Sequence, residues 1–313
     1  MTTKIELRSS VTSVLELIGN TPLIEIDHPT ERAGAIFAKA EFLNPGGSIK
    51  DRIALHLIEV AEREGQLRKG MVIAEATSGN TGIGVALVGR AKGYRVAIVM
   101  PETMSEERKK IVRALGADLV LTPREGSIEG AVKKLDELVA LNKNIWRVGQ
   151  FDNPHNPEAH YLTTGPELWR QMDGRIDAFV AGVGSGGTLQ GVGRFLKEKN
   201  PQIKLVAVEP DGFSALLGIE PGLHVIHQIQ GIGDGFVPSV LDTGIIDQVV
   251  TISDDDAVYA TRRLARTIGL LVGTSAGANV FAARRVAEAL GTGSRVATVL
   301  PDRAERYFST ALL

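Results

Sequence analysis

The chain has 313 residues, of which 43% are hydrophobic and 23% charged, a composition typical of folded globular proteins and a length that suggests two domains. The formal net charge of −2 argues against a nucleic-acid-binding protein, and the lack of cysteine excludes disulfides, thiolate nucleophiles and cysteine-ligated metals. No apolar run approaches the ~20 residues that span a bilayer, and the first ten residues lack an apolar secretory core, so we expect a cytoplasmic protein that does not enter a membrane.

Short apolar runs alternate along the chain with stretches of helical spacing. The runs are rich in β-branched residues and do not alternate strictly with polar ones, which indicates strands buried on both faces. They predict strands at 35–40, 72–76, 96–100, 119–122, 178–181, 205–208, 249–252 and 296–300. Helical spacing of apolar residues predicts helices over 51–65, 105–116 and 254–269. This order predicts an α/β protein with mainly parallel sheets.

Both halves of the chain carry a glycine-rich turn from a strand into a helix, which favours two sheets over one. The segment 150–157 (QFDNPHNP) combines two prolines with two asparagines and is the best candidate for a crossover between domains. We therefore expect two domains, each an open, mainly parallel, twisted sheet flanked by helices.

The segment 44–52 (NPGGSIKDR) places Lys50 where a predicted helix begins. The positive end of the helix dipole disfavours an ammonium group, so it lowers the pKa of a lysine at this position. A lower pKa favours the neutral amine that forms a Schiff base. The alternative is a surface lysine that happens to precede a helix, and this segment alone does not decide between the two.

The segment 75–82 (EATSGNTG) follows a predicted strand and opens a helix. Thr77, Ser78 and Thr81 offer hydroxyls there, Asn80 offers an amide, and the helix start offers free backbone N–H groups. Helix capping needs one such residue rather than four. The segment therefore predicts a site for an anion, either a carboxylate or a phosphate.

A third segment, 181–188, satisfies G-x-G-x-x-G with Gly182, Gly184 and Gly187, again between a strand and a helix. With Glu209 at the end of the next strand, it predicts the dinucleotide site of an NAD-dependent dehydrogenase. The same loop, with Ser185 and Thr188, is also suited to a single phosphate monoester. Both interpretations remain open on these residues.

A fourth segment, 273–277, has the G-x-S-x-G form of a hydrolase nucleophile elbow around Ser275. In such hydrolases the catalytic histidine follows the serine, whereas here all histidines precede it: His28, His56, His155, His160, His224 and His227. We therefore set the hydrolase hypothesis aside. His224 and His227 lie three residues apart but lack a third ligand, so no metal site is expected.

Taken together, these segments resemble the cysteine synthase (O-acetylserine sulfhydrylase) family of fold-type II, tryptophan synthase β-like, pyridoxal-phosphate (PLP) enzymes. The resemblance covers nearly the whole chain and also includes 18–23, 150–154, 163–167, 230–236 and 305–307. It implies a smaller domain over residues 43–152 with the substrate-carboxylate loop. Residues 10–42 and 153–313 would form a larger domain with the PLP phosphate loop.

The resemblance also implies roles for individual residues. Lys50 would carry PLP as a Schiff base and act as the acid and base of the reaction, and Ser275 would face the pyridine nitrogen. Asn80 would bind the ring hydroxyl. The PLP phosphate would be bound by Gly184, Ser185, Gly186, Gly187 and Thr188. The substrate carboxylate would be held by Thr77, Ser78, Asn80, Thr81 and Gln150.

The reaction that the resemblance implies is a β-replacement that makes L-cysteine from O-acetyl-L-serine and sulfide through an α-aminoacrylate intermediate. A serine, unlike an aspartate, leaves the ring nitrogen largely neutral, which suits β-elimination better than transamination. A homodimer is expected, and the C-terminal peptide of serine acetyltransferase is a candidate partner.

Three departures from the family pattern leave the substrates open: Asp234, the segment 218–222 and the pair Arg303-Ala304. Asp234 replaces a small residue near the expected entrance of the site, where a carboxylate would repel an anion or meet an ammonium group. Cystathionine β-synthase activity and O-phosphoserine sulfhydrylase activity on the same core are the alternatives.

Overall fold

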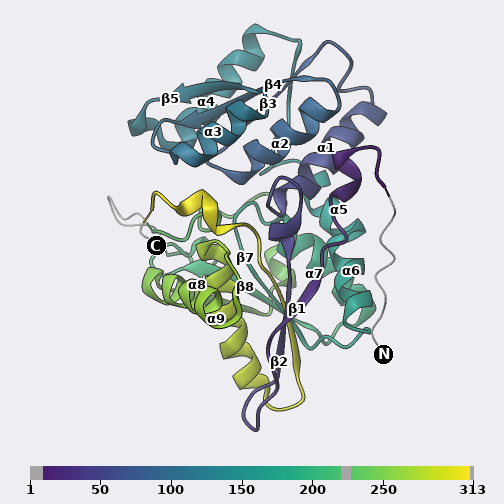
Figure 1. Cartoon of the computed structure of the whole chain (residues 1–313), viewed down its shortest axis with the longest axis vertical. Coiled ribbons are helices and arrows are strands. Elements are labelled where there is room, and N and C mark those ends of the chain that lie inside the picture. Colours follow the sequence, from purple (N-terminus) through teal and green to yellow (C-terminus); the bar gives the residue numbers. More distant parts are fainter. Residues whose placement is uncertain (1–9, 220–226, 311–313) are drawn as a thin grey trace.

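Two sheets organise the chain in the computed structural model, which describes residues 10–219 and 227–310. The larger sheet has the strand order β1-β2-β10-β7-β8-β9, and the smaller sheet has the order β5-β4-β3-β6. All strand pairs are parallel except β1 with β2. Figure 1 shows the smaller sheet and its helices above the larger sheet. The predicted α/β class is confirmed.

The strand bounds follow the predicted ones closely. The larger sheet contains β1 (Leu23–Asp27), β2 (Ala35–Lys39), β7 (Ala178–Gly182), β8 (Lys204–Pro210), β9 (Gln248–Ile252) and β10 (Arg295–Val299). The smaller sheet contains β3 (Val72–Ala76), β4 (Arg95–Pro101), β5 (Asp118–Thr122) and β6 (Ile145–Arg147). All eight predicted strands are present. β1 and β6 were not predicted, because β1 mixes charged with apolar residues at a sheet edge and β6 is only 3 residues long.

Helices cover both faces of each sheet. On the smaller sheet, α1 (Lys50–Arg63), α2 (Asn80–Ala91) and α3 (Glu106–Ala114) share one apolar core, and α4 (Ser127–Leu141) packs on the other face. On the larger sheet, α8 (Asp254–Ile268) and α9 (Thr274–Leu290) share one core. The opposite face packs on α6 (Thr164–Gln171) and α7 (Gly187–Lys199). The three predicted helices correspond to α1, α3 and α8.

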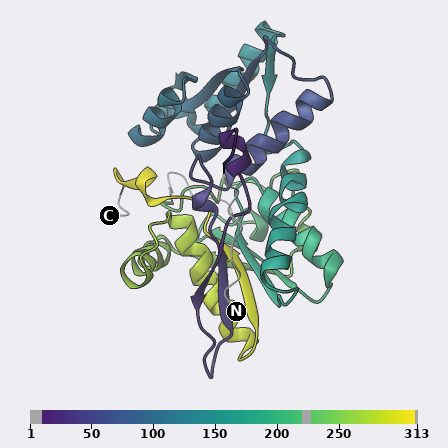
Figure 2. The same ribbon diagram turned by 45° about the vertical axis from the view of Figure 1, so that its right-hand side comes forward.

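Helix α5 (His155–Leu162) contacts both α1 and α7, so it lies where the helices of the two sheets meet. The strands of the smaller sheet all fall within residues 43–152, and those of the larger sheet within 10–42 and 153–313. Leu15 and Ile18 nevertheless pack on the core of the smaller sheet, and Figure 2 shows this purple segment between the two parts of the molecule. The domain boundaries stay a prediction.

None of the helices in the described ranges combines the length and the apolar character that a membrane crossing requires. Several helices begin where parallel strands end: α2 follows β3 after a short loop, and α7 follows β7 in the same way. In open α/β sheets, ligands bind at these carboxyl ends of the strands. The fold therefore places the candidate site between the two sheets.

Candidate active site

Two hollows lie against Lys50. One is a small cavity of about 50 Å³, lined among others by Asn80, Ser185, Thr188 and Ser275. The other is a cleft of about 260 Å³, lined among others by Thr77, Ser78, Thr81, Gln150 and Asp234. Lys50, Asn80 and Ser185 line both. The structure thus brings the predicted residues to one place, with Gly187 just behind the lining as the first residue of α7.

The side chain of Lys50 is suited to act as a neutral amine. Its Nζ lies 3.2 Å from Ser185 Oγ, to which it donates a hydrogen bond. Burial lowers the pKa of Lys50, although Asp234, Asp302 and Glu75 act in the opposite direction. We predicted a lowered pKa from the helix start, and in the structure burial lowers it as well.

Arg52, two residues into α1, fixes the start of this helix. Its guanidinium is buried and lies 2.7 Å from the carboxylates of both Glu41 and Glu167. Lys39 Nζ lies 2.6 Å from Glu167, so two cations and two carboxylates form one buried cluster. Such a cluster is geometrically demanding, because each charge is satisfied only in one arrangement. It holds the first turn of α1, and with it Lys50, against the larger sheet.

We name residues 182–188 the glycine loop. It leaves no room for a side chain at Gly182, Gly184 or Gly187, and the contacts are closest at the last two. A Cβ at Gly184 would lie 2.3 Å from Gly231 O, and one at Gly187 would lie 1.9 Å from Asn156 Oδ1. Asn156 in turn donates to Ser185 Oγ at 3.1 Å. The loop ends at the start of α7, where backbone N–H groups lack helical partners. Together with the hydroxyls, these groups fit the phosphate of PLP.

His160 supports the glycine loop through its contact with Thr188, the last residue of the loop. Its Nε2 lies 3.3 Å from Thr188 Oγ1, and its Nδ1 lies 2.9 Å from Thr164 Oγ1. Burial lowers the pKa of His160 to about 3. The imidazole therefore stays neutral across the physiological pH range. It supports the loop through its hydrogen bonds and not through a positive charge.

Residues 77–81, named the hydroxyl loop below, form the opposite wall at the start of α2. Thr81 Oγ1 donates to Gln150 Oε1 at 2.6 Å, and Thr77 Oγ1 accepts the N–H of Gly79 at 3.1 Å. Glu75 accepts the N–H of Gly149 at 2.8 Å and that of Gln150 at 3.4 Å. Burial raises the pKa of Glu75 to about 7. The arrangement offers neutral donors to a carboxylate in the cleft.

The sequence did not indicate a role for the residues that hold Asn80. Asn80 Nδ2 donates to Asp302 Oδ2 at 2.7 Å, and Arg306 donates to Asn80 Oδ1. Tyr307 OH donates to the same carboxylate oxygen of Asp302 at 2.5 Å. The signal was present in part, since Arg306 and Tyr307 belong to the motif 305–307, but their contact with Asn80 depends on the fold. Arg108, which lines the cleft and lies 5.0 Å above the Tyr307 ring, was also missed.

Asp234 lies in the cleft and contributes to the field around Lys50. Desolvation raises the pKa of Asp234, whereas Lys50 and His227 act against this rise. His227 Nε2 donates to Gly233 O at 2.9 Å, so this nitrogen is not a free metal ligand. His224 lies outside the described residues. Asp234 is therefore the feature of the cleft that most clearly bears on substrate choice.

Comparison with known proteins agrees with this geometry. A family described as "Pyridoxal-phosphate dependent enzyme" matches residues 14–302. The chain belongs to this family. A cysteine synthase of Staphylococcus aureus (strain Mu50 / ATCC 700699) is 49% identical over 304 residues, covering 96% of this chain and 97% of the relative.

Solved structures support the same conclusion. The cysteine synthase of Entamoeba histolytica superposes with a TM-score of 0.93 at 37% identity, covering 98% of this chain and 92% of that one. An O-acetylserine-dependent cystathionine β-synthase of Helicobacter pylori superposes with a TM-score of 0.91 at 43% identity, covering 97% and 99%. The predicted resemblance, the fold class and the cofactor are confirmed.

Membership of the PLP family also decides between the two interpretations of the glycine loop. Glu209, the candidate ribose ligand of a dehydrogenase, accepts hydrogen bonds from Ser214 Oγ at 2.5 Å and from the N–H of Leu216 at 3.1 Å. Its carboxylate therefore stabilises the turn after β8. The dehydrogenase alternative does not hold.

Proposed function

We propose that this PLP enzyme makes L-cysteine from O-acetyl-L-serine and sulfide by β-replacement. The observation that carries the proposal is the position of Lys50, a half-buried lysine with a lowered pKa that lines both the cavity and the cleft. A lysine there is placed to bind the cofactor on one side and to reach the amino-acid substrate on the other. Relatives named cysteine synthase support the choice of reaction.

When bound, PLP supplies an electron sink for the bond that breaks at Cα of the substrate. The protein does the rest. The hydroxyl loop and Gln150 bind the substrate carboxylate and orient Cα toward Lys50. Lys50 Nζ, as the neutral amine, removes the Cα proton, acetate leaves from Cβ, sulfide adds at Cβ, and the same nitrogen returns the proton.

The remaining predicted residues hold the cofactor in this proposal. The glycine loop binds its phosphate, and Asn80, itself fixed by Asp302 and Arg306, faces the ring hydroxyl. Ser275 faces the ring nitrogen as a neutral hydroxyl, which suits elimination of a leaving group from Cβ.

The decisive experiment locates the cofactor and measures the reaction in one preparation. Borohydride reduction followed by mass spectrometry is expected to place the pyridoxyl label on Lys50, and Lys50→Ala is expected to lose the visible absorption of the covalently bound cofactor. The native enzyme is expected to form cysteine from O-acetylserine and sulfide. A label on another residue would overturn the role of Lys50, and a correct label without cysteine formation would overturn the choice of substrates.

A second candidate concerns the acceptor. Asp234 brings a carboxylate into the cleft near Lys50, where an acceptor thiol that carries an ammonium group, such as homocysteine, would be attracted. The Helicobacter pylori relative is named as a cystathionine β-synthase that depends on O-acetylserine. A panel of O-acetylserine, O-phosphoserine and serine with sulfide or homocysteine separates these activities. Asp234→Ala is expected to lower the use of homocysteine more than that of sulfide.

We also propose a homodimer, a cytoplasmic location and binding of the C-terminal peptide of serine acetyltransferase. These proposals rest on the resemblance to cysteine synthases. Light scattering on the purified enzyme tests the dimer, cell fractionation tests the location, and competition between the peptide and O-acetylserine tests the partner.

A further inference from the structure

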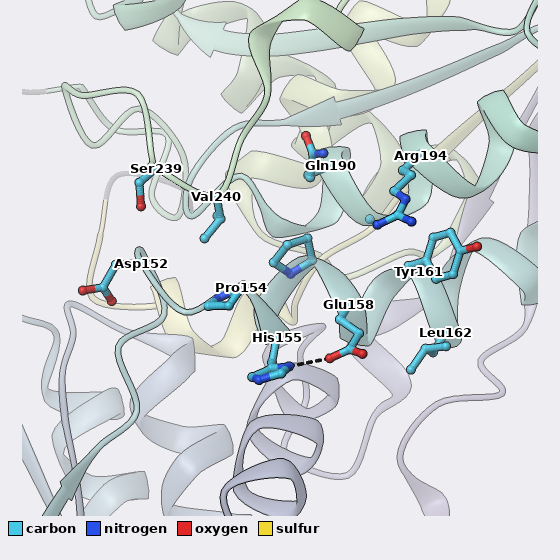
Figure 3. Close-up of a pocket in the computed structure, with 12 residues that line it drawn as sticks. Asp152, Pro154, His155, Glu158, Tyr161, Leu162, Gln190, Arg194, Ser239 and Val240 are labelled. Atoms are coloured by element: carbon cyan, nitrogen blue, oxygen red, sulfur yellow. Dashed lines mark hydrogen bonds and ion pairs between the residues drawn. The ribbon is translucent and has the colours of Figure 1, made fainter. Parts of the chain in front are cut away.

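A second hollow lies away from Lys50, beside helix α5. It has a volume of about 710 Å³ and is lined by residues of α5 and α7 and by the segment 239–240. Figure 3 shows His155 and Glu158 at its edge, joined to one another. His56 of α1 meets the same carboxylate from the other side. Two imidazoles and one carboxylate, taken from two helices, thus gather at one point.

The distances among these three side chains are compatible with a bound ion. His155 Nδ1 lies 2.5 Å from Glu158 Oε2, and His56 Nε2 lies 3.0 Å from the same oxygen. The three candidate ligand atoms all lie within 4.8 Å of one another. Zinc ligands at ~2.0–2.2 Å from the metal lie about 3.3–3.5 Å apart in a tetrahedral site. Small side-chain rotations therefore suffice to open the cluster around an ion.

A further carboxylate supports the ligand geometry. Because Nδ1 of His155 faces Glu158, its Nε2 faces outward, where Glu64 Oε1 lies 3.7 Å away. A metal-binding imidazole commonly donates its second N–H to a carboxylate, which fixes the tautomer and makes the ligand more basic. Glu64 lies close to that position, at ion-pair rather than hydrogen-bond distance from His155, and a small rotation would bring it within reach.

The cluster is also open enough for an ion to enter. The side chains of His56, His155 and Glu158 are 19%, 30% and 41% exposed, so none of them is locked in the core. The adjoining hollow leaves space for a water molecule as a fourth ligand. Three protein ligands with one open position are a common arrangement for zinc.

We propose that His56, His155 and Glu158 form a zinc-binding site that bridges α1 and α5. Two imidazoles select zinc or a similar transition metal, since magnesium and calcium prefer oxygen ligands. Because α1 begins at Lys50 and α5 packs on α7, the ion would join a helix of the smaller sheet to one of the larger sheet. The sequence predicted no metal site, because His56 and Glu158 stand 102 positions apart and meet only in the fold.

The test measures zinc binding to the untagged, PLP-loaded enzyme after dialysis against a chelator. Titration with zinc chloride against a competing dye is expected to show one equivalent of zinc in the native protein, and none in His56→Ala or His155→Ala. Glu64→Gln is expected to weaken binding about 10- to 100-fold. The visible absorption of the cofactor is recorded throughout, so that any zinc that reacts at the active site is recognised.

His28→Ala is the matched control, because His28 pairs with Glu25 at 2.8 Å in an exposed i,i+3 pair, with no second imidazole beside it among the residues that the structure describes. This variant is expected to keep the full equivalent of zinc. Saturating zinc is expected to raise the melting temperature of the native enzyme and of His28→Ala, but not of the two ligand variants.

Circular dichroism checks that the variants are folded, and His155→Gln replaces His155→Ala if the latter is not. Two results overturn the proposal: a native enzyme that takes up no zinc, or zinc retained by His56→Ala and by the folded His155 variant.

Discussion

The glycine loop and the hydroxyl loop are built from the same local parts but differ in what surrounds them. Each follows a parallel strand, begins a helix and offers hydroxyls with backbone N–H groups to an anion. The glycine loop is closed in by Gly231 and Asn156, with no space for a Cβ at Gly184 or Gly187. The hydroxyl loop faces the open cleft. In the proposed roles, tight packing suits the glycine loop to a retained group, whereas the open cleft suits the hydroxyl loop to a substrate that enters and leaves.

The residues that support the two loops also differ, in whether they titrate near neutral pH. The glycine loop rests on His160, whose pKa of about 3 keeps it neutral. The hydroxyl loop depends on Gln150, whose backbone is held by Glu75, a group with a pKa of about 7. The first support is independent of pH near neutrality, whereas the second titrates there. Five predictions use this contrast.

The largest effect is expected from adding a methyl group to the glycine loop. Gly187→Ala would place a Cβ 1.9 Å from Asn156 Oδ1, and Asn156 is held by its hydrogen bonds to Gln150 O and Ser185. Overpacking of about 1–3 kcal/mol corresponds to cofactor binding that is about 5- to 150-fold weaker. Cofactor absorbance after dialysis measures this loss.

Gly79→Ala is the control in the hydroxyl loop. Its added Cβ would lie 3.1 Å from Nε of Arg108, so this side chain would have to shift by only a few tenths of an ångström. We expect this variant to keep its cofactor. Equal loss of cofactor in both variants would mean that the two loops are not specialised in the proposed way.

Removing one hydroxyl from each loop, in separate variants, should change a different binding property about tenfold in each. Thr81→Val leaves Gln150 Oε1 without its donor at 2.6 Å, and a buried group left unsatisfied costs about 1–3 kcal/mol. We expect the KM for the amino-acid donor to rise about 10-fold with unchanged cofactor content. Thr188→Val should have the opposite effect: the cofactor content should fall, and the KM for the donor should stay unchanged. Steady-state kinetics and absorbance separate the two outcomes, and the opposite pattern would exchange the roles of the loops.

The sequence predicted those parts of the site that consist of consecutive residues in the chain. Lys50, the hydroxyl loop and the glycine loop each consist of a short run whose function depends on a strand before it and a helix after it. Glycine positions, hydroxyls and the helix start are all visible in such a run. The predicted strands were found for a related reason, since buried parallel strands form continuous apolar runs.

What the sequence did not reveal depends on contacts between distant segments. Asp302 reaches the site because residues after β10 form isolated bridges, Ser48 with Asp302 and Val272 with Arg303. Arg108 enters the cleft only because α3 packs beside α2. No spacing rule links these positions to Lys50, so their place follows from the tertiary fold alone.

The pH dependence of donor binding should give a smaller, roughly fivefold effect. Protonated Glu75 no longer accepts both N–H groups as a carboxylate, so Gln150 is held less firmly below pH 7. Loss of about 1 kcal/mol corresponds to a KM for the donor that is about 5-fold higher at pH 6.5 than at pH 8. Cofactor retention should stay constant over this range. A profile of KM against pH measures the effect, and Glu75→Gln should flatten it.

The same titration has a consequence for stability. Because the pKa of Glu75 is raised in the folded state, the native protein binds more protons than the unfolded chain between about pH 4.5 and 7, and the free energy of unfolding falls as pH rises through this window. Glu75→Gln should remove that part of the slope. Asp51, whose pKa is also raised to about 7 by burial, should leave a residual slope of the same sign. Urea denaturation at several pH values measures both, and an unchanged slope would contradict the role of Glu75.

The smallest effect is expected at Ser275, which lines the cavity but is not part of the glycine loop. A neutral hydroxyl facing the ring nitrogen contributes a weak hydrogen bond, and losing about 0.5 kcal/mol corresponds to a turnover about 2- to 3-fold lower. Ser275→Ala should therefore keep its cofactor and lose little activity. The neighbouring Thr274 is a matched control, because its hydroxyl donates to Gln228 O at 3.2 Å. Thr274→Val should leave turnover unchanged. If Ser275→Ala instead lost its cofactor, Ser275 would anchor the cofactor ring together with the glycine loop. Retention of the cofactor would then also depend on the start of α9.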